Sequence, residues 1–108
     1  MSNEFSISTR QLFMDNYECW ICKMNNWDCL HHIVGRAKSK NNCESSPLNA
    51  APLHNYKCHI QIHGRLLKDD KIRYLLQKTY VYLTDRGYEL TNLDKTFIKK
   101  YKKYYDNI

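Results

Sequence analysis

The residues of this chain that can do metal chemistry are its cysteines and histidines. All five cysteines and all five histidines lie between residues 19 and 63. Thiolate sulfur and imidazole nitrogen are the ligands that zinc and other transition metals prefer. An odd number of cysteines without an export signal does not form a typical disulfide framework. The clustering therefore indicates metal binding.

Two spacings are informative. Cys19 and Cys22 are separated as in a zinc knuckle, which supplies two of the four ligands of a closed tetrahedral site. His59 and His63 stand four positions apart, which on a helix places both imidazoles on one face. A third ligand from a neighbouring element would complete a site open to substrate and water.

Two strands and a loop are predicted in the middle of the chain. Residues 29–34 end in β-branched residues and are bounded by Gly35, which is typical of a strand. Residues 48–53 are predicted to form a second strand, which Pro52 restricts to a sheet edge or a strand end. The polar residues 35–47 form the loop between the two strands.

Helices are predicted on both sides of these strands. Ser8 and Gln11 match a capping box, which predicts a short helix over 8–15. A second helical pattern begins at about Tyr56 and carries the spaced histidine pair. The predicted order is therefore helix, strand, loop, strand and helix.

Two further helices are predicted in the C-terminal part. The first starts after Asp69 or Asp70 and ends near Gly87, with an inward stripe of Ile72, Leu75, Leu76, Thr79 and Leu83. The second starts after Thr91 or Asn92, and its inward side is predicted to carry Leu93, Phe97, Tyr101 and Tyr104. Its opposite side carries Lys95, Lys99, Lys100, Lys102 and Lys103. The predicted fold class is α+β.

Composition limits the class of protein. With 108 residues, the chain is predicted to be a single domain over 1–108. Seventeen Lys plus Arg against eleven Asp plus Glu give a net charge of +6, which indicates a polyanionic partner. A content of 26% charged and 13% aromatic residues argues against a disordered chain. No apolar run reaches the roughly 18 residues of a membrane span, and residues 1–10 lack the pattern of a secretory signal, so a cytoplasmic location is expected.

Four segments in order resemble one family. They are Cys19-Trp20-Ile21-Cys22, Leu30-His31-His32-Ile33, Asn49-Ala50-Ala51-Pro52-Leu53 and Cys58-His59-Ile60-Gln61-Ile62-His63-Gly64. Together they resemble the HNH endonucleases, which are built on a ββα-metal core, and the resemblance covers residues 19–64. Each motif alone is common, whereas the ordered set is not. The resemblance implies an HNH core over about 19–66, flanked by α-helices that include a C-terminal extension over about 67–108.

The resemblance also implies an activity and residue roles. It implies metal-dependent hydrolysis of DNA phosphodiester bonds, with His31, His59 and His63 holding a catalytic divalent ion. It assigns the general base to His32, and it assigns to Asn49 the orientation of the loop that carries this base. Three imidazoles favour Zn, Ni or Mn, while some members of the family use Mg with fewer protein ligands.

The paired histidines set a condition on the first strand. Adjacent residues on a regular strand point to opposite faces. His31 and His32 can therefore serve one phosphate only if the strand ends or bulges there. Gly35, shortly afterwards, fits such an ending.

A structural zinc is also implied. Zinc-bearing members of the family carry Pro-Leu-Cys-x-x-Cys-His before the metal-binding helix, where this chain has Pro52-Leu53-His54 and then, one residue later than the pattern, Cys58-His59. The site implied here consists of Cys19, Cys22, His54 and Cys58. Cys29 and Cys43 are alternatives to His54 as the fourth ligand. Zinc would fasten the knuckle to the following helix and so brace a small core.

Basic residues after the paired histidines suit contact with DNA. Arg36, Lys38 and Lys40 are expected to hold phosphates, which gives affinity without sequence information. The alternative is a zinc-braced nucleic-acid-binding module without turnover. His32 favours the enzyme, because a binding module needs no base beside a metal ligand. By analogy alone, a small basic HNH chain suggests a role with phage packaging proteins, in the host cytoplasm, or in a mobile element.

Overall fold

The computed structural model describes residues 5–34, 43–54 and 69–106. The predicted DNA-contact residues Arg36, Lys38 and Lys40 lie outside the described residues. So does the segment predicted to form a helix with Cys58, His59 and His63.

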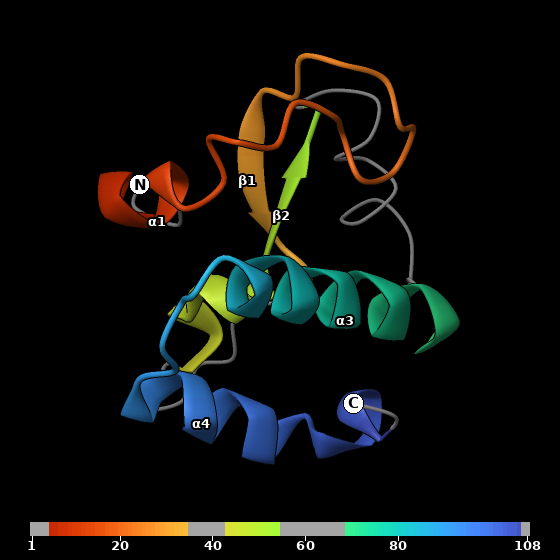
Figure 1. The fold of residues 1–108 in the computed structure, drawn as a ribbon. Coiled ribbons are helices and arrows are strands. Elements are labelled where there is room, and N and C mark those ends of the chain that lie inside the picture. The colour runs from red at the N-terminus through yellow and green to blue at the C-terminus, as the bar shows by residue number, and fades with distance from the viewer. Residues whose placement is uncertain (1–4, 35–42, 55–68, 107–108) are drawn as a thin grey trace.

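Two short antiparallel strands form the sheet (Figure 1). Strand β1 (Cys29–His32) pairs with β2 (Ala50–Leu53), so that His31 lies opposite Ala51 and His32 opposite Ala50. The prediction of two strands is confirmed, although both strands are shorter than predicted. β1 ends at His32, and both histidines lie within the paired part of the strand.

A pair of 3-10 turns precedes β2 and explains its later start. These are η1 (Cys43–Ser45) and η2 (Pro47–Asn49). The Ser46 hydroxyl accepts a hydrogen bond from the Leu48 amide at 3.0 Å, and Pro47 occupies the first position of η2, where its missing N–H costs nothing. The predicted strand residues 48 and 49 therefore belong to this turn.

Helix α1 (Ile7–Gln11) is shorter than predicted, and its cap differs. The prediction that Ser8 caps this helix is wrong. Ser6 has the extended conformation of a cap and accepts a hydrogen bond from the Thr9 amide at 3.2 Å, whereas Ser8 lies within the helix. The capping box with Gln11 is consequently not formed.

Helix α3 (Asp69–Asp85) supplies most of the helical core. Of the predicted inward stripe, Leu75, Leu76, Thr79 and Leu83 are buried, and Ile72 is partly buried against the core. The helix closes at Gly87, whose φ of 85° is left-handed and whose amide donates to the Thr84 carbonyl at 3.0 Å.

The last helix, α4 (Asn92–Lys100), continues into the 3-10 turn η3 (Lys102–Tyr105). Phe97 and Tyr104 are buried as predicted, but Leu93 is 37% exposed, so its inward assignment is wrong. Its neighbour Asp94 is turned inward instead. The Asp94 carboxylate accepts hydrogen bonds from Tyr88 and from the Thr91 amide, which completes a capping box.

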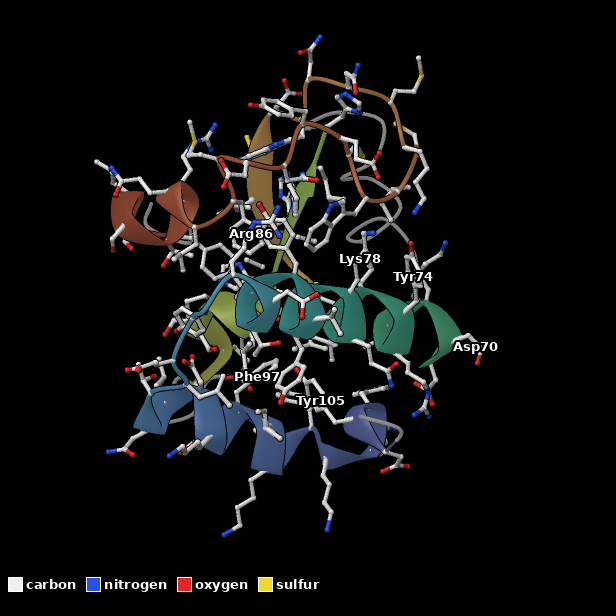
Figure 2. All side chains as sticks on the ribbon, viewed as in Figure 1. Asp70, Tyr74, Lys78, Arg86, Phe97 and Tyr105 are labelled. Atoms are coloured by element: carbon white, nitrogen blue, oxygen red, sulfur yellow. The ribbon has the colours of Figure 1, made fainter. Side chains whose placement is uncertain are left out.

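The elements stack in layers around α3. The sheet and the N-terminal segment lie on one side of this helix, and α4 with η3 lies on the other (Figure 1). Phe97 and Tyr105 project between α3 and α4, whereas Tyr74, Lys78 and Arg86 lie on the opposite side of α3 (Figure 2). The described ranges thus form an α+β fold with a two-stranded sheet and three α-helices. Within them, no helix combines the length and apolar character needed to cross a membrane.

Candidate metal centre and strand-end site

A tight turn presents the two knuckle cysteines. The Cys19 amide donates to the Met24 carbonyl at 2.8 Å, and the Lys23 amide donates to the Cys19 carbonyl at 2.9 Å. Lys23 adopts a left-handed φ of 68°, which reverses the chain directly after Cys22. The Ile21 amide points at the Cys19 sulfur, 3.4 Å away. An N–H directed at sulfur stabilises the thiolate form, which is the form that binds metal.

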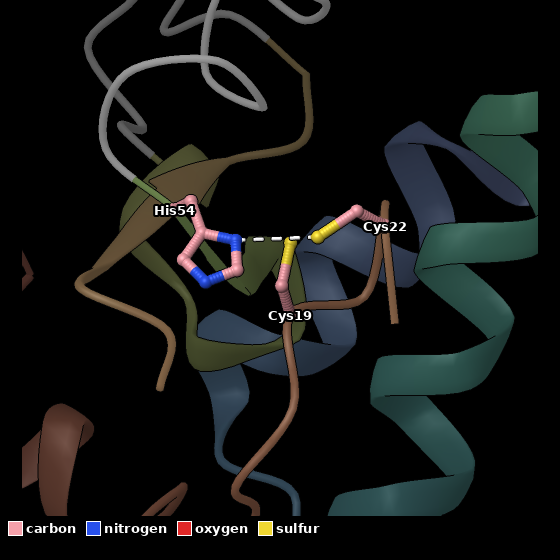
Figure 3. A group of neighbouring side chains, drawn as sticks. All are labelled: Cys19, Cys22 and His54. Carbon is pink, nitrogen blue, oxygen red and sulfur yellow. Dashed lines mark hydrogen bonds between the residues drawn. The ribbon is translucent and has the colours of Figure 1, made fainter. Parts of the chain in front are cut away.

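The structure brings His54 to these cysteines (Figure 3). The sulfurs of Cys19 and Cys22 and a ring nitrogen of His54 all lie within 4.8 Å of one another. Cys22 Sγ lies 3.3 Å from His54 Nδ1. The Trp20 amide donates to the Pro52 carbonyl at 3.0 Å, which ties the turn to β2, the strand that ends next to His54.

The hydrogen bonding of His54 selects the nitrogen that faces the sulfurs. Its Nε2 lies 3.0 Å from the Asn25 carbonyl oxygen, which can only accept, so Nε2 carries a proton. In the neutral ring, Nδ1 then presents its lone pair toward Cys22. A ligand histidine held through its second nitrogen by a carbonyl is the usual arrangement in metal sites. The same carbonyl raises the pKa of His54 when no ion competes for Nδ1.

Three of the four predicted zinc ligands are therefore assembled. Two thiolates and an imidazole are a donor set that suits zinc, and one more ligand closes a tetrahedron. Cys58 lies outside the described residues. Among the described residues, neither Cys29 nor Cys43 belongs to the group formed by Cys19, Cys22 and His54.

The paired histidines occupy the end of β1. His31 is buried, and His32 is half-buried. The rings of His32 and Phe5 stack with centroids 4.2 Å apart and planes at 24°. Stacking contacts the face of the imidazole, whereas a nitrogen lone pair lies in the ring plane, so the contact with Phe5 does not itself use the in-plane lone pair.

Asn49 clamps the chain just beyond His32. Its Oδ1 accepts from the Val34 amide at 2.9 Å, and its Nδ2 donates to the Val34 carbonyl at 3.0 Å. The Asn49 carbonyl also accepts from the Ile33 amide at 2.8 Å. A fully buried side chain that bonds both backbone groups of one residue fixes the direction in which the strand leaves the sheet.

Sequence reasoning did not identify Glu44 as a partner of this clamp. The Glu44 carbonyl accepts a second hydrogen bond from Asn49 Nδ2 at 2.9 Å, and the Glu44 side chain is fully buried. The neighbouring sequence carries no signal for this burial, because a glutamate in a polar segment is expected to be solvent-exposed.

Comparison of the chain with protein-family models, with curated proteins and with solved structures finds no match.

Proposed function

We propose that this protein is a metal-dependent DNA endonuclease of the HNH class, with low sequence specificity and a ββα-metal core. The observation that carries the proposal is the Asn49 clamp on Val34, located where β1 ends with the paired histidines. In this proposal, the hydrogen bonds of Asn49 to Val34 fix the direction of the chain directly after His32, which is the role predicted for this asparagine.

The chemistry explains the residue types. A phosphodiester resists hydrolysis because its charge repels the nucleophile and because an alkoxide is a poor leaving group. A bound divalent ion supplies charge neutralisation to the phosphoryl group and to the leaving oxygen. The predicted ligands for it are His31, His59 and His63, of which His31 is described and lies on β1 opposite Ala51.

His32 is the proposed general base. Imidazole is largely unprotonated near neutral pH and can accept a proton from the attacking water. A base must keep its direction toward that water, and two contacts serve this end. Phe5 holds the ring plane, and Asn49 holds the backbone that follows.

Cys19, Cys22 and His54, with Cys58, are proposed to hold a structural zinc that braces the domain. The proposed substrate is DNA, because a net charge of +6 suits a polyanion. Arg36, Lys38 and Lys40 stay predicted phosphate contacts.

The second candidate is a zinc-braced nucleic-acid-binding module without turnover. The group of Cys19, Cys22 and His54 favours it as much as it favours the enzyme, since a structural ion serves either function. The two candidates differ at His32, which a binding module does not use.

A plasmid-nicking assay tests the proposal. Wild type and His32→Ala are incubated with supercoiled DNA and added Mg, Mn, Ni or Zn, and metal content is measured in parallel. We expect wild type to produce open-circular DNA with at least one ion, and His32→Ala to lose this activity while retaining its metal. If no ion supports cleavage although DNA is bound, the binding module is the correct function.

A further inference from the structure

A fully buried carboxylate joins the C-terminal helix to the segment between the strands. Glu44 Oε2 accepts hydrogen bonds from Lys100 Nζ and from the Tyr101 hydroxyl, each at 2.5 Å. Lys100 ends α4, and Tyr101 caps it. Burying a charge is costly unless partners of this kind neutralise it. The two partners therefore determine where Glu44 can lie.

The backbone of the same residue reaches the strand end. Asn49 Nδ2 is shared between the carbonyls of Glu44 and Val34, at 2.9 Å and 3.0 Å. The two carbonyls fix the amide orientation that directs Oδ1 at the Val34 amide. Hydrogen bonds thus connect α4 to the Glu44 side chain, and the Glu44 carbonyl to Asn49, which in turn binds Val34.

We propose that Glu44, held by Lys100 and Tyr101, is a positioning residue for His32, so that the C-terminal helix forms part of the frame of the active site. This inference rests on the proposed function. If the Lys100 and Tyr101 side chains are removed, the buried Glu44 carboxylate is more stable in water, so the side chain rotates outward. This rotation also shifts the Glu44 backbone carbonyl. Asn49 then loses one of its two acceptors, and the strand end after His32 is released.

A second carboxylate offers a matched comparison. Asp94 is also fully buried and also accepts a phenolic hydrogen bond at 2.5 Å, from Tyr88. Its other partners are the Ser46 hydroxyl at 2.6 Å and the Thr91 amide at 2.8 Å. Asp94 reaches the Asn49 backbone through Ser46, whose carbonyl accepts a hydrogen bond from the Asn49 amide at 2.9 Å. Ser46 donates to Asp94 Oδ1, whereas Tyr88 donates to Oδ2, so loss of the Tyr88 hydroxyl leaves both the Ser46 bond and the side-chain bonds of Asn49 to Val34 and Glu44 in place.

The test compares Tyr101→Phe and Glu44→Gln with Tyr88→Phe. Three quantities are measured for each full-length variant: Tm, hydrogen exchange of the Val34 amide relative to that of Leu76 in α3, and the kcat and KM of plasmid nicking. Tyr101→Phe keeps the carboxylate and one of its partners, so it gives a reading if Glu44→Gln does not fold.

We expect Tyr101→Phe and Glu44→Gln to speed exchange at Val34 selectively. We also expect kcat to fall, by about tenfold in Glu44→Gln, while KM for DNA is unchanged, which is the size of effect typical of residues that orient an active group. Tyr88→Phe, at a comparable loss of Tm, should change neither the exchange rate of the Val34 amide nor kcat by more than about twofold.

Two results would overturn the inference in distinguishable ways. If wild type cleaves DNA but Val34 exchange and kcat follow Tm alike in all three variants, Glu44 is a structural brace and the proposed function stands. If wild type does not cleave DNA although Val34 responds to Glu44→Gln, the proposed function is wrong and the positioning role falls with it.

Discussion

Replacement of Asn49 by aspartate isolates the clamp, because the two side chains have the same shape. Asp keeps an oxygen at the Oδ1 position, where the Val34 amide donates. It places a second oxygen where Nδ2 now donates to the carbonyls of Val34 and Glu44. Two attractive contacts therefore become repulsive, at a site that is 0% exposed.

The loss of stability expected for Asn49→Asp can be estimated from these contacts. Two lost hydrogen bonds cost about 1 kcal/mol each, and the buried carboxyl group adds about 1 to 3 kcal/mol for desolvation without a donor in that position. Asn49→Asp should therefore lower the free energy of unfolding by about 3 to 5 kcal/mol, a large share of the total for a small domain. At lower pH the free energies of unfolding of Asn49→Asp and wild type should differ less, because the introduced carboxyl group, once protonated, can donate one hydrogen bond again.

Urea unfolding at pH 7, followed by the fluorescence of Trp20 and Trp27, measures this difference. Asn92→Asp is the matched control, because Asn92 is exposed at the first position of α4, where a negative charge is mildly favourable. If the free energy of unfolding of Asn49→Asp were within about 0.5 kcal/mol of the wild-type value, the range of an ordinary surface substitution, the two Nδ2 hydrogen bonds would not stabilise the strand end.

Three other predictions follow from single features. Gly87→Ala should lower the free energy of unfolding by about 1 kcal/mol, because the φ of 85° disfavours a residue with a Cβ, and Gly87→Asn should lower it by less, because Asn tolerates this conformation better. An added Cβ would meet nothing within 4 Å, so no steric clash contributes, and thermal or urea unfolding measures both variants. Freshly purified protein should contain zinc by elemental analysis, and both chelation and Cys19→Ser should lower Tm. Burial raises the pKa of Glu44, but hydrogen bonds from Lys100 and Tyr101 outweigh it and lower the pKa below its ordinary value. Its stabilising contribution is therefore complete above that ordinary value and disappears as the pH falls through the folded-state pKa, so that acid unfolding curves of wild type should be steeper than those of Glu44→Gln.

Local patterns predicted those elements whose residues carry their own periodicity. The stripe of α3 could be identified because Leu75, Leu76, Thr79 and Leu83 repeat at helical spacing and all lie inward. The position of His54 beside Cys19 could be proposed because His54 follows Pro52-Leu53, where the pattern that the chain resembles has a ligand cysteine. Such signals need no knowledge of distant contacts.

Long-range contacts decided what the sequence did not predict. Apolar character predicts Leu93 inward, yet the neighbouring Asp94 takes that position because it accepts hydrogen bonds from Ser46, which is 48 residues away, and from Tyr88. Glu44 is buried for the same reason. Its partners Lys100 and Tyr101 come from the far end of the chain, at separations of 56 and 57 residues.

In the proposed catalytic site, His31, His59 and His63 hold one divalent ion and His32 lies beside this ion without binding it. Anomalous diffraction from crystals grown with Mn or Ni tests this directly. We predict one peak about 2.1 Å from a nitrogen of each of the three rings, with no such bond to His32, and a separate zinc signal at Cys19 and Cys22. A single signal confined to the cysteines, with the three imidazoles apart, would show that these histidines do not share an ion.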